Sequence, residues 1–155
     1  MRRTDREVTE RSEILRVLES CKVCRIGMVD GDSVYVLPLN FGYRYEDDVL
    51  ELYFHSAREG KKLGLLRACP RVGFEMDCDH GLISAEVPCQ YGYRFSSLVG
   101  NGTVEFLESP AEKMSALRLL MLHQSGKDFT FDEAMVGGVE VFRLVVSGFS
   151  CKRRP

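Results

Sequence analysis

Residues 50–70 read LELYFHSAREGKKLGLLRACP and join a strand to the start of a helix. The first residues are rich in the apolar and aromatic types that favour strands, and the closing proline is typical of a helix end. Ser56 followed three residues later by Glu59 is a capping box, in which each side chain binds a backbone N–H left free by the first turn. This pattern predicts a helix that begins at Ala57.

Two adjacent lysines in the first turns of this helix, Lys61 and Lys62, give its start the features of an anion site. A helix N-terminus carries partial positive charge and free N–H groups, which together favour a phosphate. The Ser56 hydroxyl adds another donor. An ordinary capped helix with solvated lysines is the alternative interpretation of the same residues.

The composition predicts one cytoplasmic domain over residues 1–155. Hydrophobic residues make up 45% of the chain and charged residues 28%, and the net charge of −2 leaves no positive excess for a nucleic-acid backbone. No secretory signal follows the N-terminal arginines, and no apolar run approaches the ~18 to 20 residues that span a bilayer. Arg2, Arg3 and residues 152–154 are expected to be solubilising tails, and no membrane partner is expected.

The six cysteines are expected to be reduced and to bind no metal. Cys21 and Cys24 form a CxxC, and Cys78 with His80 forms a C-x-H, but the second pair lacks the spacing of a common zinc site. Residues 22–29 also read as a strand, in which side chains three apart point to opposite faces. The cysteines expected to be buried as small hydrophobic side chains are Cys24, Cys69 and Cys89.

Turn residues divide much of the chain into short strands. An Asp-Gly pair at residues 30–31 lies between two β-rich runs and is a strong hairpin signal. A second hairpin is expected to turn at residues 45–48. The expected strands are 22–29, 33–41, 49–55, 71–78, 96–107 and 139–149, with a seventh, less regular strand over 81–90 that Pro88 interrupts.

Two further helices have recognisable start signals. Thr9 can cap a short amphipathic helix that ends at Ser20. Residues 109–112, Ser-Pro-Ala-Glu, combine a capping box with proline at the first helical position, and the helix that follows stops near Gly126. Residues 129–138 are expected to form an irregular or briefly helical connection.

Short hairpin links between successive strands argue against a parallel sheet, which needs crossover helices. We therefore predict a mainly β fold, a closed or partly closed antiparallel barrel with peripheral helices. Pro38 lacks an N–H and places its strand at an edge, where free backbone groups can bind a planar heterocycle, although an edge with nothing bound is equally consistent. Gly100 and Gly102 predict a bulge or bend in a long strand.

His55 is the one histidine with a suggestive setting, at the end of a strand beside a helix start. The positive helix end would keep its imidazole neutral, and a neutral imidazole can still donate a hydrogen bond. His80 and His123 are interpreted as incidental. The motifs of serine hydrolases, Rossmann folds and P-loops are absent from the sequence.

Three blocks of the sequence, taken with their order and spacing, resemble the flavin-binding split-barrel family related to pyridoxamine 5'-phosphate oxidase. The blocks are PLNFG at 38–42, LYFHSA with GKK at 52–62, and YRFSSLV with Gly102 at 93–102. The sequence is most similar to the nitroimidazole-resistance (Nim) branch of that family. The resemblance covers residues 4–149.

The resemblance implies a six-stranded antiparallel split β-barrel that forms a homodimer, with FMN, or in some members FAD, at the subunit interface. It places one strand along the isoalloxazine ring. The end of another strand and the helix start that follows it surround the phosphate and ribityl chain, and a serine on a later strand also reaches the flavin. His55 is also implied at the active site. The implied cofactor-binding residues are Leu37, Pro38, Leu39, Asn40, His55, Ser56, Lys61, Lys62 and Ser97.

The function that the resemblance implies is an FMN-dependent oxidoreductase. Electrons would come from a nicotinamide donor and pass to a nitro-aromatic or related small molecule. A flavin-binding protein without turnover and a haem-binding split barrel are the alternatives. Lysine stands at position 61 where pyridoxamine oxidases carry arginine, and their C-terminal arginine and histidine pattern is missing, which argues against oxidation of pyridoxamine phosphate.

Overall fold

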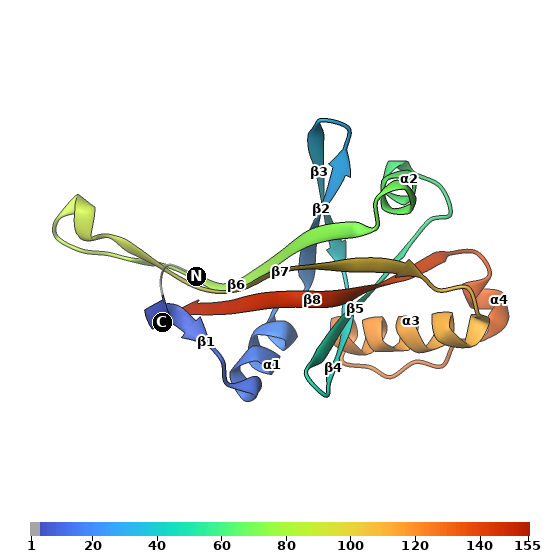
Figure 1. The fold of residues 1–155 in the computed structure, drawn as a ribbon. Helices are drawn as coiled ribbons and strands as arrows, with labels where there is room; N and C mark the ends of the chain where they lie inside the picture. Colours follow the sequence, from blue (N-terminus) through green and yellow to red (C-terminus); the bar gives the residue numbers. More distant parts are fainter. Residues whose placement is uncertain (1–3) are drawn as a thin grey trace.

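The computed structural model describes residues 4–155 and shows one large antiparallel sheet with helices around it (Figure 1). Arg2 and Arg3 lie outside the described residues. The strands are β1 (Glu7–Val8), β2 (Val23–Asp30), β3 (Ser33–Asn40), β4 (Gly42–Glu46), β5 (Val49–Ser56), β6 (Arg71–Ile83), β7 (Gly92–Phe106) and β8 (Glu140–Arg154). The helices are α1 (Arg11–Ser20), α2 (Lys61–Ala68), α3 (Pro110–Ser125) and α4 (Glu133–Val136), with short 3-10 helices η1 (Thr4–Arg6) and η2 (Pro88–Gln90).

The sheet has eight strands, with β1 paired to the C-terminal end of β8 and the others in the order β3-β2-β6-β7-β8-β5-β4. This confirms the antiparallel fold with peripheral helices but corrects the count of six. β1 has only two residues, and β4 merges in sequence with the run before it, so neither gave a separate signal. The sheet also stays open, because the edge strands β3 and β4 are joined through the buried Phe41 without pairing.

Both predicted hairpins are present. β2 and β3 pair along their whole length, and Gly31 takes the left-handed conformation, with φ of 61°, in the turn between them. The turn between β4 and β5 passes through Asp47 and Asp48, whose φ angles of 47° and 61° are also positive. Aspartate tolerates this region better than most side chains do.

The three central strands run further than the sequence predicted. β6 reaches Ile83 rather than residue 78, β7 begins at Gly92, and β8 continues to Arg154 rather than ending at residue 149. Residues 152–154 are therefore not a free tail, since β8 pairs there with β1 and β7. Pairing between distant segments, rather than local residue type, sets these lengths.

The predicted irregularity in the long strand β7 is confirmed as a register shift between Asn101 and Gly102 opposite β8. A Cβ atom at Gly102 would collide with the carbonyl oxygen of Val145. Glycine is required here because the two backbones approach too closely for a side chain.

The helix starts agree with the sequence in one case and differ in another. The Ser109 hydroxyl accepts a hydrogen bond from the N–H of Glu112 at 3.2 Å, and Gly126, with φ of 70°, ends α3 as predicted. α1 begins at Arg11 without a side-chain cap, so the cap predicted at Thr9 is wrong.

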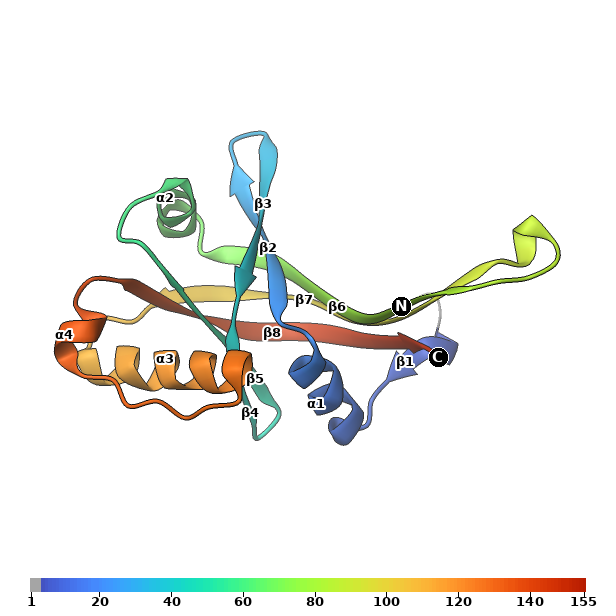
Figure 2. The ribbon, with the colours of Figure 1, turned by 180° about the vertical axis from the view of Figure 1, so that it is seen from behind.

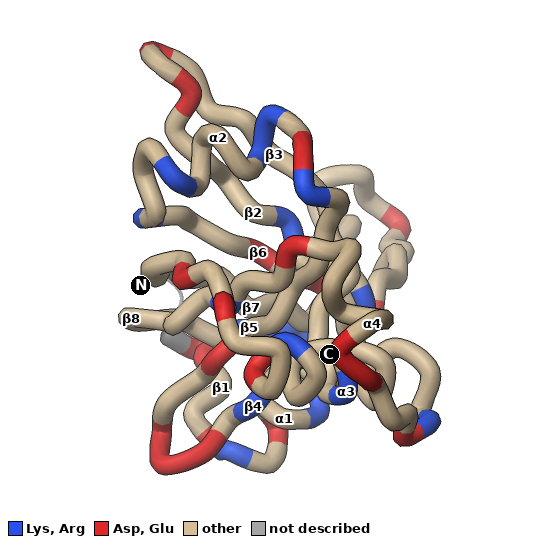
Figure 3. Tube along the Cα trace, turned by 90° about the vertical axis from the view of Figure 1, so that its right-hand side faces the viewer, with Lys and Arg blue, Asp and Glu red and all other residues tan. Residues whose placement is uncertain are grey.

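α1 and α3 lie on one side of strands β6 to β8, and α2 lies on the other, in both views of the ribbon (Figures 1 and 2). The β6–β7 hairpin projects beyond the sheet as an arm, residues 79–95, that carries η2 at its tip. Cys89 lies in η2 and is exposed, so its predicted burial is wrong, whereas Cys24 is buried and Cys69 partly so. Basic and acidic residues are interspersed along the trace (Figure 3).

His123, interpreted from sequence as incidental, is a buried structural residue that is 5% exposed. Its Nε2 lies 2.8 Å from the carbonyl oxygen of Cys21, and its ring packs against Phe41 and Tyr43 at centroid distances of 4.7 and 5.1 Å. Burial lowers the pKa of His123 below its usual value. The neutral imidazole therefore ties α3 to the end of α1.

Candidate functional site

The connection from β5 to α2 differs from the predicted capping box. Ser56 remains in the sheet, opposite Glu140 of β8, and its hydroxyl donates to the carbonyl of Ala57 at 2.7 Å. The helix begins at Lys61, after Gly60 with φ of 140°, and not at Ala57. Because the β5–β8 ladder continues through Ser56 and the helix begins five residues later, Ser56 does not stand at the cap position.

The N-terminus of α2 therefore has free backbone donors. No side chain of the described residues caps its first turn. The N–H of Leu63 donates to the carbonyl of Gly60 at 3.1 Å, which leaves the N–H groups of Lys61 and Lys62 without a partner among the described residues. The helix is held in place by Leu63 and Leu66, which are both buried. This end of the helix carries partial positive charge and suits an anion.

The two predicted lysines have different surroundings. Lys61 Nζ lies 2.5 Å from Asp30 Oδ2 and 4.9 Å from the centre of the Tyr35 ring, so it links α2 to the β2–β3 hairpin. The hydrogen bond with Asp30 raises the pKa of Lys61. Lys62 is partly buried and forms no ion pair with another residue of the described part of the chain. Lys62 is thus the cation available to a ligand at the helix start.

His55 is the penultimate residue of β5, opposite Val141, and its side chain is exposed at the strand end. Partial desolvation by the surrounding protein and the charge of Lys62 both lower the pKa of His55. The imidazole is therefore neutral at pH 7, as the sequence predicted. The causes are desolvation and the neighbouring charge of Lys62.

β3 is an edge strand that pairs only with β2, as its proline predicted. Leu37 and Leu39 are partly buried and pack against the core, while Pro38 and Asn40 are exposed. The side-chain amide of Asn40 donates to the carbonyl of Lys22 at 3.1 Å, which fixes the end of the strand. The outer backbone edge of β3 remains free to bind polar atoms.

Ser97 lies apart from the other predicted residues. It sits on β7, paired with Asp77 and Lys152, and β7 is three strands from β3 in the sheet. No hydrogen bond within the described chain joins Ser97 to the start of α2 or to β3. The chain therefore brings together the residues on α2, the end of β5 and the β2–β3 hairpin, but not Ser97.

Asp30 and Tyr35 are the site residues that sequence reasoning missed. Asp30 was recognised only as part of a hairpin turn, and Tyr35 only as an apolar strand residue. Both meet Lys61 through packing of α2 beside the hairpin. No local pattern in the sequence marks such a contact between residues about thirty positions apart.

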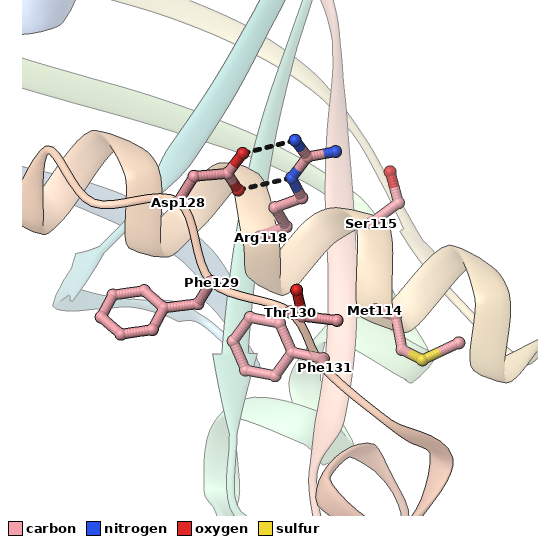
Figure 4. A pocket seen from close by; sticks show the side chains of 7 residues that line it. All are labelled: Met114, Ser115, Arg118, Asp128, Phe129, Thr130 and Phe131. Atoms are coloured by element: carbon pink, nitrogen blue, oxygen red, sulfur yellow. Dashed lines mark hydrogen bonds and ion pairs between the residues drawn. The ribbon is translucent and has the colours of Figure 1, made fainter.

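Five pockets of about 160 to 410 Å³ lie elsewhere on the molecule and contain none of the predicted site residues. One of them lies between α3 and the segment that follows it (Figure 4). There Arg118 donates two hydrogen bonds of 2.5 Å to Asp128, beside the rings of Phe129 and Phe131. Because the two charges neutralise each other, this pocket has little attraction for an ion.

A family profile described as pyridoxamine 5'-phosphate oxidase matches residues 10–153 of the chain. This chain belongs to the pyridoxamine 5'-phosphate oxidase family. The resemblance seen in three sequence blocks is confirmed, and the fold is that of the flavin-binding split barrels.

Solved structures with the same fold include three informative relatives. A candidate 5-nitroimidazole antibiotic resistance protein from Bacteroides thetaiotaomicron is 29% identical with a TM-score of 0.81, over 95% of this chain and 86% of that one. A FAD-binding protein from Mesorhizobium loti is 26% identical with a TM-score of 0.65, over 95% and 96%. A flavocytochrome from Azotobacter vinelandii, 18% identical with a TM-score of 0.80 over 100% and 72%, shares the fold. No curated protein matches this chain.

Within the described residues, no helix is both long enough and apolar enough to cross a membrane.

Proposed function

We propose that this protein is an FMN-dependent oxidoreductase that takes electrons from a nicotinamide donor and reduces a nitro-aromatic or related small molecule. The observation that carries the proposal is the uncapped N-terminus of α2 beside the edge strand β3. The names of the Bacteroides and Mesorhizobium relatives, both more than 25% identical, support the substrate class and the flavin.

The donors around the start of α2 fit a flavin phosphate. They are the N–H groups of Lys61 and Lys62, the Lys62 ammonium and the neutral His55 imidazole. The Ser56 hydroxyl donates to Ala57, so it could act as a phosphate donor only by giving up that bond. A phosphate with ~2 negative charges forms charge-assisted hydrogen bonds with such groups. Gly60 leaves open space where a side chain would stand, since nothing lies within 4 Å of a Cβ built there.

The edge of β3 fits the ring system. Its backbone N–H and C=O groups on the side away from β2 have no strand partner, and Pro38 removes one donor from the row. A planar heterocycle with polar atoms on its rim can hydrogen-bond to the groups that remain. Leu37 and Leu39 would position this strand by packing against the core.

We propose that a second copy of the chain completes the site. The outer face of the β2–β3 hairpin exposes three valines, Val29, Val34 and Val36, by 51%, 66% and 57%. Adjacent apolar side chains on one face are typical of a surface that another protein covers. A homodimer in which Ser97 approaches from the partner would also account for its separation from the other predicted residues.

When bound, the flavin supplies the redox chemistry by accepting hydride from the nicotinamide donor and passing electrons to the acceptor. The chain supplies placement and charge. Lys62 balances the phosphate, and the β3 edge orients the ring. His55 stays neutral at pH 7 and donates one N–H toward the flavin or substrate.

The absorption spectrum of the purified protein tests cofactor binding. We expect flavin bands, and release of the chromophore should yield FMN. A Soret band would assign the protein to haem instead, and a colourless protein that does not take up added FMN would overturn the proposal. A change from homodimer to monomer on Val34→Glu substitution would support the proposed interface.

Turnover is tested by mixing the yellow protein with NADH or NADPH and then with a nitroimidazole. Bleaching followed by reoxidation is expected, whereas inertness would make the protein a flavin binder without turnover. His55→Ala should lower turnover more than it lowers FMN affinity. His80→Ala is the matched control, because His80 lies on β6 and pairs with Asp77 at 2.6 Å. Unchanged turnover in His55→Ala would exclude the proposed role of His55.

A further inference from the structure

A pocket of about 250 Å³ lies at the other end of the molecule from α2, where the arm leaves the sheet near the C-terminus (Figure 1). It is lined by residues of α1, β6, β7 and β8. Four of its lining residues are arginines, Arg16, Arg94, Arg153 and Arg154. This density of guanidinium groups around one small pocket needs a physical explanation.

Two of the four arginines are neutralised within the chain. Arg16 lies 3.0 Å from Asp79 and 3.3 Å from Glu13, and Arg153 lies 2.8 Å from the same Glu13 carboxylate. Two carboxylates therefore balance these two guanidinium groups. Arg16 and Arg153 therefore add no uncompensated charge to the pocket.

The other two arginines, Arg94 and Arg154, have no ion pair within residues 4–155. The pocket therefore carries two positive charges that no described carboxylate offsets. Each free guanidinium lies over a glycine. A Cβ at Gly81 would be 2.6 Å from Arg94 Nη2, and one at Gly92 would collide with Arg154 Nη2. Glycine at both positions makes room for the guanidinium groups against the backbone.

The buried side of the pocket is formed by hydrogen-bonded polar side chains. Ser96 is 0% exposed, and its hydroxyl donates to Asp79 at 2.6 Å and accepts from Arg16 Nη2 at 3.3 Å. Asp79 has a φ of 60° in a bulge of β6, where the register shifts between Cys78 and Gly81. Aspartate tolerates this region better than most side chains do.

We propose that this pocket is a second anion site, which binds a phosphate group through Arg94 and Arg154. A guanidinium matches phosphate oxygens with two parallel hydrogen bonds, and two free positive charges balance a phosphate dianion. The pocket has room for the phosphate and part of an attached group. None of the residues that line this pocket is assigned to the proposed flavin site, and phosphate binding here does not require that proposal to hold.

Free phosphate and a phosphate monoester share this chemistry, and titration distinguishes them. Inorganic phosphate and adenosine 2'-monophosphate are titrated into the full-length protein, as purified with its cofactor, and heat and phosphorus NMR signals are followed. Saturable binding is expected for inorganic phosphate, and tighter binding of the monoester would show that the attached group also makes contact. Adenosine without phosphate should not bind.

The double variant Arg94→Gln/Arg154→Gln should weaken phosphate binding by about tenfold or more, because two charge-assisted contacts are lost. Arg71→Gln, at an exposed position at the other end of β6, is the matched control and should bind like the unaltered protein. The flavin content of the double variant should not change. Arg154→Gln alone, close to the chain end, serves as a second variant if the double variant does not fold.

Three outcomes would overturn the inference. Inorganic phosphate would show no saturable binding, or it would bind equally well to the control and to the arginine variants. The third outcome is that the arginine variants become monomeric while the unaltered protein binds no phosphate. That result would assign the arginines to a subunit contact.

Discussion

The helices α2 and α3 are preceded by the same Ser-x-x-Glu signature, yet they begin in different ways. At α3, Ser109 caps the helix by accepting from the N–H of Glu112 at 3.2 Å. At α2, Ser56 belongs to a strand, Glu59 precedes the helix, and Gly60 stands at the cap position without a side-chain bond. The signature provides a cap only at α3, because only there does the serine stand directly before the first helical residue.

This difference separates a structural helix start from a candidate binding site. One of the first-turn donors of α3 is used by its own cap, and a proline occupies its first helical position. At α2 the N–H groups of Lys61 and Lys62 have no partner among the described residues, and they lie beside the Lys62 ammonium, whose charge no described residue pairs. We infer that an anion should bind at α2 and not at α3.

The largest expected effect is on cofactor affinity. Lys62→Ala should raise the Kd for FMN about 10- to 100-fold, because a hydrogen bond to a charged group contributes about 1.5–3 kcal/mol. Lys113→Ala, in the first turn of α3, should leave the Kd unchanged. Titration of FMN into the apoprotein, followed by quenching of flavin fluorescence, measures both values. Equal increases in Kd for the two variants would show that the start of α2 is no better an anion site than the start of α3.

The cap itself should affect stability at only one helix. Ser109→Ala should lower the free energy of unfolding by about 1 kcal/mol, the usual contribution of a serine N-cap. Glu59→Ala should leave stability within about 0.5 kcal/mol, since Glu59 is exposed and caps nothing. Denaturant unfolding measures both variants. A comparable loss for Glu59→Ala would show that the α2 signature acts as a cap after all.

The ion pair between Lys61 and Asp30 allows a test in the opposite direction. Asp30→Asn should free the lysine and strengthen FMN binding, by less than Lys62→Ala weakens it. Asparagine before glycine suits the same tight turn, so the β2–β3 hairpin should persist. Asp32→Asn is the control in the same turn. The gain should shrink at high salt, and no gain at low salt would place Lys61 outside the anion site.

The smallest expected effect concerns pH. The pKa values of His55, beside α2, and His123, in the last turn of α3, are both lowered in the folded protein. As the pH falls below about 6.5, the unfolded chain takes up these protons first, so stability is full above that pH and declines toward the lowered folded values. His123→Gln should reduce this decline in thermal unfolding midpoints between pH 7.5 and 5.

Local patterns predicted a large part of the fold and part of the site. The Asp-Gly turn, the edge position of Pro38, the irregularity near Gly102 and the cap at Ser109 are each set by neighbouring residues, and each is present. The same holds for the neutral state of His55. The neighbouring residues alone did not show that β8 runs to the chain end, since that depends on pairing with β1 and β7.

The sequence by itself determined the family, the antiparallel class, the hairpins and the residues that gather at the end of β5 and the start of α2. Tertiary structure alone decided that Ser56 stays in the sheet, that Asp30 neutralises Lys61 and that two unpaired arginines share a pocket with Ser96. The physical reason is the sequence separation over which each interaction acts. Turn geometry and proline act through adjacent residues, whereas strand pairing and charge neutralisation join residues that only folding brings together.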